Sequence, residues 1–177
     1  MKIDCITLFP EMFTPLEHSI IGRARKNGLI DFRTIFLRDF AINDYGQVDD
    51  APYGGEPGMV LRPEPLAKAI RSTGVRQNKG TVIYLTADGT PFTHQIAKEL
   101  SQKEHLVLVC GHYKGIDERI RESEIDMEIS IGDFVVSGGE LPAMVLTDAV
   151  GRLLEGALGN KESGETDSFA QGVLGWP

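Results

Sequence analysis

The stretch LVLVCGHYKG, residues 106–115, decides the fold because five consecutive apolar residues lead straight into a glycine-containing loop. A run this short suits a strand better than a helix, and a strand without polar positions must be buried on both faces. Such strands belong to parallel sheets, whose helical crossovers cover either side. The stretch therefore predicts an α/β fold built on a mostly parallel sheet.

The rest of the chain alternates between strand-like and helix-like segments in the same way. Apolar or β-branched runs predict strands at Lys2–Phe9, Phe32–Phe36, Thr81–Thr86 and Ile129–Ile131, with a turn at Asp88-Gly89. Apolar residues at helical spacing predict helices at Glu11–Lys26, Leu66–Ser72, Thr93–Gln102 and Leu141–Leu154. The polar residues 43–57 predict a long loop. We therefore expect helices on both faces of the sheet.

The chain is expected to form one domain followed by an arm. A length of 177 residues fits a single domain. The apolar pattern ends near residue 158, so residues 1–158 are the predicted folded part. Residues 159–177 are rich in Gly, Ser, Glu and Asp and predict a flexible arm, to which Phe169, Leu174 and Trp176 add apolar groups that can dock elsewhere.

Composition and charge exclude several classes of protein. No apolar run approaches the roughly 20 residues that span a bilayer, and the N-terminus does not resemble a signal peptide, so we expect a cytoplasmic protein with no membrane partner. Cys5 and Cys110 lie in apolar strand segments, which favours buried free thiols over a disulfide or a metal site. A net charge of −8 disfavours nucleic-acid binding by electrostatics alone, and no DNA partner is expected. RNA contact would then need a local patch such as Arg23–Lys26 or Arg119–Arg121, unless these are only solvated surface charges.

Three predicted strands run into loops that contain glycine, at residues 86–89, 111–115 and 132–140. Ligands of open α/β sheets bind beyond the carboxyl ends of the strands, and glycine lets the backbone approach them closely. The glycine patterns of dinucleotide and ATP phosphate sites are absent. An adenine held by backbone groups in an apolar slot suits these loops better, with plain turns as the alternative.

Five segments resemble the bacterial tRNA (guanine-N1) methyltransferase family, TrmD, of the knotted SPOUT class. They are FPEMF (9–13), DDAPYGGEPGMV (49–60), CGHYKGIDER (110–119), SIGDFVVSGGELPAMVL (130–146) and LGNKESGETDSFAQG (158–172). The resemblance implies a homodimer that uses S-adenosylmethionine to methylate the guanine immediately 3′ of the tRNA anticodon. It also implies a deep trefoil knot formed around Cys110–Gly115 and Ile131–Gly139, which nothing in the periodicity indicates.

The resemblance implies residue roles as well. The expected cofactor contacts are Leu85, Thr86, Gly111, Tyr113, Ile131, Gly132, Phe134, Val136, Gly138, Gly139 and Pro142. Ile131, Phe134 and Val136 would equally suit a plain core. Guanine N1 carries a proton at neutral pH, so a base must remove it as the methyl is transferred. Asp167 matches the family's base, and Arg152 matches the cation that stabilises charge on the guanine O6.

Three departures from the family pattern stand out. Lys114 replaces an expected glutamate associated with magnesium, and because lysine cannot ligate a metal, magnesium dependence and normal turnover both come into question. Glu56 replaces a glycine of the GGGPG stretch. The sequence ends at Pro177, before the family's C-terminal tRNA-binding domain, as a fragment or a natural short form would. The alternative to an enzyme is a non-catalytic module that binds S-adenosylmethionine or RNA, and a generic nucleotide-binding protein ranks last.

Overall fold

A computed structural model describes residues 1–177 except 53, 56, 160–167, 171–173 and 175–177. Its main sheet has five parallel strands in the order β2-β1-β6-β5-β7. The bounds are β1 Lys2–Thr7, β2 Asp31–Phe36, β5 Thr81–Pro91, β6 His105–Cys110 and β7 Met127–Ser130. A small antiparallel pair, β3 Asp49–Asp50 with β4 Val60–Leu61, lies inside and just after the predicted long loop. The predicted parallel α/β sheet is confirmed.

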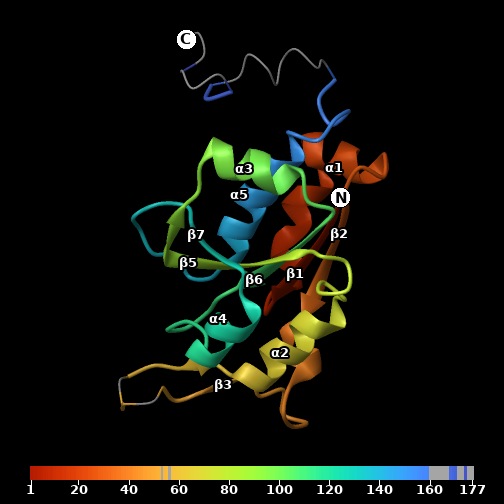
Figure 1. Cartoon of the computed structure of the whole chain (residues 1–177). Helices are drawn as coiled ribbons and strands as arrows, with labels where there is room; N and C mark the ends of the chain where they lie inside the picture. The colour runs from red at the N-terminus through yellow and green to blue at the C-terminus, as the bar shows by residue number, and fades with distance from the viewer. Residues whose placement is uncertain (53, 56, 160–167, 171–173, 175–177) are drawn as a thin grey trace.

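Helices cover both faces of this sheet (Figure 1). Their bounds are α1 Ser19–Lys26, α2 Pro63–Ser72, α3 His94–Ser101, α4 Glu118–Glu124 and α5 Glu140–Gly151, with short 3-10 helices at Pro10–Glu17 and Leu37–Phe40. α1, α3 and α5 pack on one face, and α2 and α4 on the other. No helix in the described part of the chain is long and apolar enough to cross a membrane.

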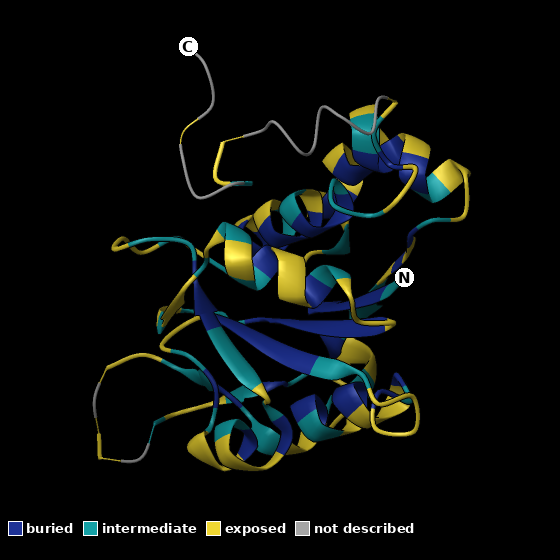
Figure 2. Cartoon of the chain, turned by 45° about the horizontal axis from the view of Figure 1, so that its top comes forward, coloured by how far each residue is buried: buried dark blue, intermediate teal, exposed yellow. Residues whose placement is uncertain are grey.

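The strand period explains why there are two cores. Along β6, Leu106 and Leu108 contribute to the core under α1, α3 and α5, whereas Val107 and Val109 contribute to the core under α2 and α4. All six residues of β6 are buried, as the LVLVC stretch predicts. Figure 2 shows the buried strands between two helical layers whose outer sides are exposed.

The predicted turn at Asp88-Gly89 is wrong. β5 continues to Pro91, and its pairing with β7 shifts register between Leu85 and Thr90, so the residues between them bulge out of the ladder. A Cβ on Gly89 would lie 2.6 Å from the Ile129 backbone nitrogen. Gly89 therefore allows β5 to lie directly against the backbone of β7. In the sequence, a glycine required by this distant contact cannot be told from a glycine required by a turn.

One predicted helix needs correction, and one observed helix was not predicted. The predicted helix Glu11–Lys26 is a 3-10 helix containing Pro15 followed by α1, with an extended residue, His18, between them. α4 was not predicted, because its sequence ERIRESE has one apolar residue, Ile120, and so lacks a helical apolar period. Asp117 caps α4 by accepting a hydrogen bond from the Arg119 backbone.

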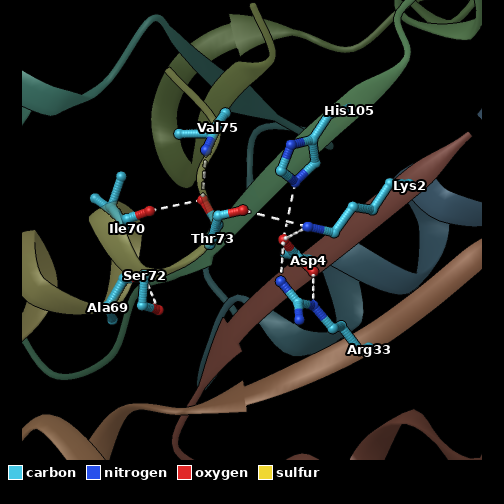
Figure 3. Close-up of polar contacts among 9 residues, drawn as sticks. All are labelled: Lys2, Asp4, Arg33, Ala69, Ile70, Ser72, Thr73, Val75 and His105. Atoms are coloured by element: carbon cyan, nitrogen blue, oxygen red, sulfur yellow. Dashed lines mark hydrogen bonds and ion pairs between the residues drawn. The ribbon is translucent and has the colours of Figure 1, made fainter. Parts of the chain in front are cut away.

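A buried acid lies in the amino-terminal half of β1 (Figure 3). Asp4 has no exposed surface, and Lys2, Arg33 and His105 all point toward its carboxylate. His105 Nε2 lies 2.8 Å from Asp4 Oδ2, and Lys2 Nζ lies 3.2 Å from the same oxygen. Burial alone would raise the pKa of Asp4. The hydrogen bonds from Arg33, His105 and Lys2 lower it by a larger amount, so the pKa of Asp4 lies below its ordinary value.

Candidate functional site

A pocket opens at the carboxyl ends of β5, β6 and β7, where the three glycine-containing loops meet. It is lined by Tyr84–Ala87, by Gly111–Gly115, and by most of the segment from Ser130 to Gly139, with Pro142 of α5. All eleven residues expected to contact the cofactor line this one pocket, although they come from segments up to 57 residues apart (142 − 85). Their common location is thus as the sequence implies, and their role in binding stays a prediction.

The loops after β6 and β7 cross in direct backbone contact. The Gly139 backbone N–H donates to the Gly111 carbonyl oxygen at 2.9 Å. A Cβ on Gly139 would lie 2.5 Å from the Cys110 Cα and 2.9 Å from the Gly111 nitrogen. Because both are backbone atoms, only glycine fits at this crossing without displacing the loop that lines the pocket.

The pocket walls combine apolar side chains with backbone groups. Leu85 and Pro142 are buried, whereas Phe134 is 55% exposed and Tyr113 is 50% exposed at the opening. Tyr113 has a φ of +60°, a strained conformation for an aromatic residue, which turns the loop after β6 around the pocket. An apolar pocket bordered by loops that offer backbone groups is the kind of surface that fits an adenine base held by main-chain hydrogen bonds.

His112 joins this pocket to a buried carboxylate. Its Nε2 lies 2.9 and 2.8 Å from the two oxygens of Glu140, the first residue of α5. The Thr7 hydroxyl at the end of β1 donates to the same carboxylate at 2.6 Å and in turn accepts from the Phe9 N–H. Burial alone would raise the pKa of Glu140. The hydrogen bonds from His112 and Thr7 lower it by a larger amount, so the pKa of Glu140 lies below its ordinary value and the carboxylate is ionised at neutral pH.

Sequence reasoning missed this pair. Glu140 is 1% exposed and His112 lies 28 positions away, so no local pattern connects them. A charged residue at the start of a mostly apolar helix was the one available signal, since an unpaired buried carboxylate is very costly.

Lys114 lines the same pocket and is exposed. Its backbone N–H donates to the Met59 carbonyl, and a Cβ on Gly58 would lie 2.8 Å from its Cγ, so the lysine stem lies along residues 58–59. Among the residues that the structure describes, no three His, Cys, Asp or Glu side chains are grouped as metal ligands. Glu56, the other departure in this region, lies outside the described residues.

Of the two expected catalytic residues, Arg152 is described and does not line this pocket. Arg152 is the residue that caps the end of α5, and it lines a separate hollow between α3 and α5 with Phe92, Asp148 and Ser168. Asp167 lies outside the described residues, one position before Ser168. Within a single chain, the described structure therefore brings the expected cofactor contacts together but not Arg152.

The cysteine prediction is confirmed. Cys5 and Cys110 are free thiols, both buried, with 3.5 Å between their sulfur atoms. Burial raises the pKa of the Cys110 thiol, so this group stays protonated beside the pocket.

Known proteins match along the whole chain. Residues 1–177 match the family model described as tRNA (Guanine-1)-methyltransferase TrmD. The tRNA (guanine-N(1)-)-methyltransferases of Staphylococcus aureus and Staphylococcus epidermidis are each 52% identical to it, over 100% of this chain and 72% of their own length. The crystal structure of tRNA (m1G37) methyltransferase from Aquifex aeolicus superposes with a TM-score of 0.83 at 41% identity, covering 90% of this chain and 72% of that one.

This structural match also confirms the knotted α/β fold that the resemblance implies. The agreement of the family model, the curated relatives and the fold leaves one conclusion: the chain belongs to the tRNA (guanine-1)-methyltransferase family TrmD.

Proposed function

We propose that this chain transfers a methyl group from S-adenosylmethionine to N1 of the guanine immediately 3′ of the tRNA anticodon. The observation that carries the proposal is the convergence of all eleven expected cofactor contacts on one pocket of a TrmD-family fold. The proposal places the enzyme in the cytoplasm, where its tRNA substrate is found.

The pocket residues fit S-adenosylmethionine. Leu85, Val136 and Pro142 supply apolar surface for an adenine, and glycines at the loop crossing leave backbone groups accessible to ribose and base. When bound, this cofactor supplies an electrophilic methyl group on a sulfonium and leaves as neutral S-adenosylhomocysteine. The loops orient the donor, and orientation is a large part of catalysis in a methyl transfer.

The remaining chemistry concerns the guanine. Its N1–H must lose a proton while the new N–CH₃ bond forms, and we assign this proton to the Asp167 carboxylate. Negative charge that builds on O6 is stabilised by the Arg152 guanidinium. Lys114 cannot hold a magnesium ion. We therefore propose that the transfer depends on the charges of Asp167 and Arg152 and not on a metal at position 114.

A homodimer would bring these groups to the pocket. Arg152 lies in a hollow apart from the cofactor pocket of its own chain, which favours its action on a partner's pocket. The outer side of α5 carries exposed apolar residues, Leu141 at 49% and Val145 at 47%, which suit a contact with a second copy. The arm of residues 159–172 would then complete the partner's site.

Calorimetry and a transfer assay test the proposal in sequence. The first step is titration of the chain with S-adenosylmethionine, with ATP as the control ligand. The expected result is saturable binding near one cofactor per chain and no heat with ATP. Absence of cofactor binding would refute the proposed site.

The second step is methyl incorporation into a tRNA with guanine 3′ of its anticodon, compared with a tRNA carrying adenine there. We expect product only with guanine, and a loss of about 10²-fold or more in Asp167→Ala with cofactor affinity retained. Cofactor binding without product at any enzyme concentration would identify a non-catalytic binding module instead.

A further inference from the structure

The His112–Glu140 pair has no part in the proposed transfer, yet it joins three segments around the pocket. Glu140 begins α5, His112 belongs to the loop after β6, and Thr7 ends β1. The pocket is bounded by His112 but not by Glu140, so the carboxylate lies behind the imidazole.

Hydrogen bonding fixes which nitrogen of His112 carries a proton. An ionised carboxylate can only accept, so the Nε2 bonded to Glu140 must be the protonated nitrogen. Gly138 leaves room for the ring, because a Cβ there would lie 2.2 Å from His112 Cε1, and the Phe9 ring packs beside it with 5.2 Å between the ring centroids.

Resting on the proposed function, we propose that the Glu140–His112 pair is a specificity device of the cofactor pocket. The negative charge of its buried Glu140 carboxylate favours the cationic sulfonium of S-adenosylmethionine over the neutral thioether of S-adenosylhomocysteine. Adenine, ribose and amino-acid groups are common to both ligands, so the walls of the pocket bind them alike. Loss of the sulfonium charge on methyl transfer removes this attraction and so promotes release of the product.

The other titratable groups around the pair do not supply this charge. Burial raises the pKa values of the Cys110 thiol and of the Tyr84 and Tyr113 phenols, so all three are neutral between pH 5 and 8. The Cys5 thiol lies against Cys110, and Asp133 is exposed on the segment after β7. Arg121, 5.9 Å from the Tyr84 ring centroid, forms ion pairs with Asp88 and Glu128.

Lys114 is the opposing charge on the pocket lining. It is exposed and therefore screened by water, whereas Glu140 is 1% exposed. A buried charge acts through a lower effective dielectric constant, so the Glu140 carboxylate dominates the field at the inner wall.

The test measures the affinities of the full chain for both ligands by calorimetry. The measured quantity is the ratio of the Kd for S-adenosylhomocysteine to the Kd for S-adenosylmethionine. We expect Glu140→Gln to reduce this ratio about tenfold at pH 8, the effect of removing one nearby buried charge. A purely structural role would weaken both ligands by the same factor and leave the ratio unchanged, which would overturn the inference.

A second variant covers the case in which Glu140→Gln does not fold. His112→Lys places a permanent cation beside the Glu140 carboxylate, so it should lower the ratio. His112→Asn keeps an uncharged donor for Glu140 and should not lower the ratio. His18→Asn, which removes an exposed histidine outside the pocket lining, should behave as wild type. An equal ratio in His112→Lys and His112→Asn would also overturn the inference.

These outcomes separate the inference from the proposed function. If the wild-type chain binds neither ligand, the proposed function fails and the inference falls with it. If the chain binds both ligands and the ratio changes neither in Glu140→Gln nor in His112→Lys, only the inference fails.

Discussion

Removing the Asp4 carboxylate should destabilise the fold without touching the cofactor pocket. The change we consider is Asp4→Ala, which deletes the one acceptor shared by Lys2, Arg33 and His105. These three residues differ in how well water can replace the lost carboxylate, and that difference sets the magnitude.

His105 contributes most of the expected loss. It is 2% exposed, and its Nδ1 already lacks a hydrogen-bond partner in the described structure. Deleting Asp4 leaves Nε2 unpaired as well, which costs about 1–3 kcal/mol for a buried polar group. The side chains of Arg33 and Lys2 are 49% and 28% exposed, so each can turn to water and adds at most about 1 kcal/mol. The expected decrease in the free energy of unfolding is therefore about 2–4 kcal/mol.

Equilibrium urea unfolding followed by circular dichroism measures this decrease. Asp4→Asn should lose less, about 1–2 kcal/mol, because its amide oxygen can still accept from His105. Asp31→Asn, which removes an exposed acid from the neighbouring strand β2, is the matched control and should stay within about 0.5 kcal/mol of wild type.

The pH dependence gives an independent check on the same carboxylate. Because the pKa of Asp4 is lower in the folded chain than its ordinary value of 3.8, its contribution is present above about pH 4 and is lost as pH falls through the folded-state pKa. The stability difference between wild type and Asp4→Asn should shrink below pH 4. A loss under 0.5 kcal/mol in Asp4→Ala, or a difference that does not shrink in acid, would refute the reasoning.

Other substitutions test the pocket and its surroundings. Gly139→Ala places a Cβ 2.5 Å from the Cys110 Cα, so cofactor affinity should fall at least about tenfold by calorimetry, whereas Gly159→Ala, with no atom of the described residues within 4 Å of its Cβ, should match wild type. Lys114→Glu reverses a charge on the pocket lining and should tighten S-adenosylmethionine binding, and we expect this variant, but not the wild-type chain, to respond to added magnesium. Arg152→Lys should slow methyl transfer about 10²-fold in single-turnover assays with unchanged cofactor affinity, since Arg152 is assigned to the guanine O6 and not to the cofactor; a matching loss of affinity would argue against its assigned role.

Local patterns in the sequence were sufficient where one segment determines its own structure. The LVLVC run predicts β6 because burial on both faces requires apolar residues at every position, and α3 follows from its apolar spacing and its Thr93 cap. The bulge of β5 was not predictable, because the residue at position 89 must be glycine to avoid a clash with the backbone of β7, which is some 40 residues away in the sequence (129 − 89). The knot is of the same kind: Gly139 meets Gly111 only after the chain has crossed itself, and periodicity carries no record of that crossing.

The candidate site shows the same division. Glycines at the strand ends indicate in the sequence where the pocket lies. The resemblance to a family was needed to choose the eleven expected cofactor contacts among the residues of these loops. His112 and Glu140 were missed because a buried hydrogen-bonded pair is a property of two segments. Either residue alone looks like an ordinary loop histidine or the acidic first turn of a helix.

The two buried carboxylates that meet β1 are neutralised to different extents, and this difference separates stability from function. Asp4, in the amino-terminal half of the strand, is surrounded by Lys2, Arg33 and His105, so its charge is balanced and its effect is on folding. Glu140, bonded to Thr7 at the carboxyl end, is paired with His112 and with no lysine or arginine in the described structure. A carboxylate balanced by permanent cations presents little net charge to a ligand, whereas a buried carboxylate without a lysine or arginine beside it keeps more of its field. Substitution of Asp4 should therefore change the unfolding free energy and leave the ratio of cofactor to product affinity constant, while Glu140→Gln should lower that ratio.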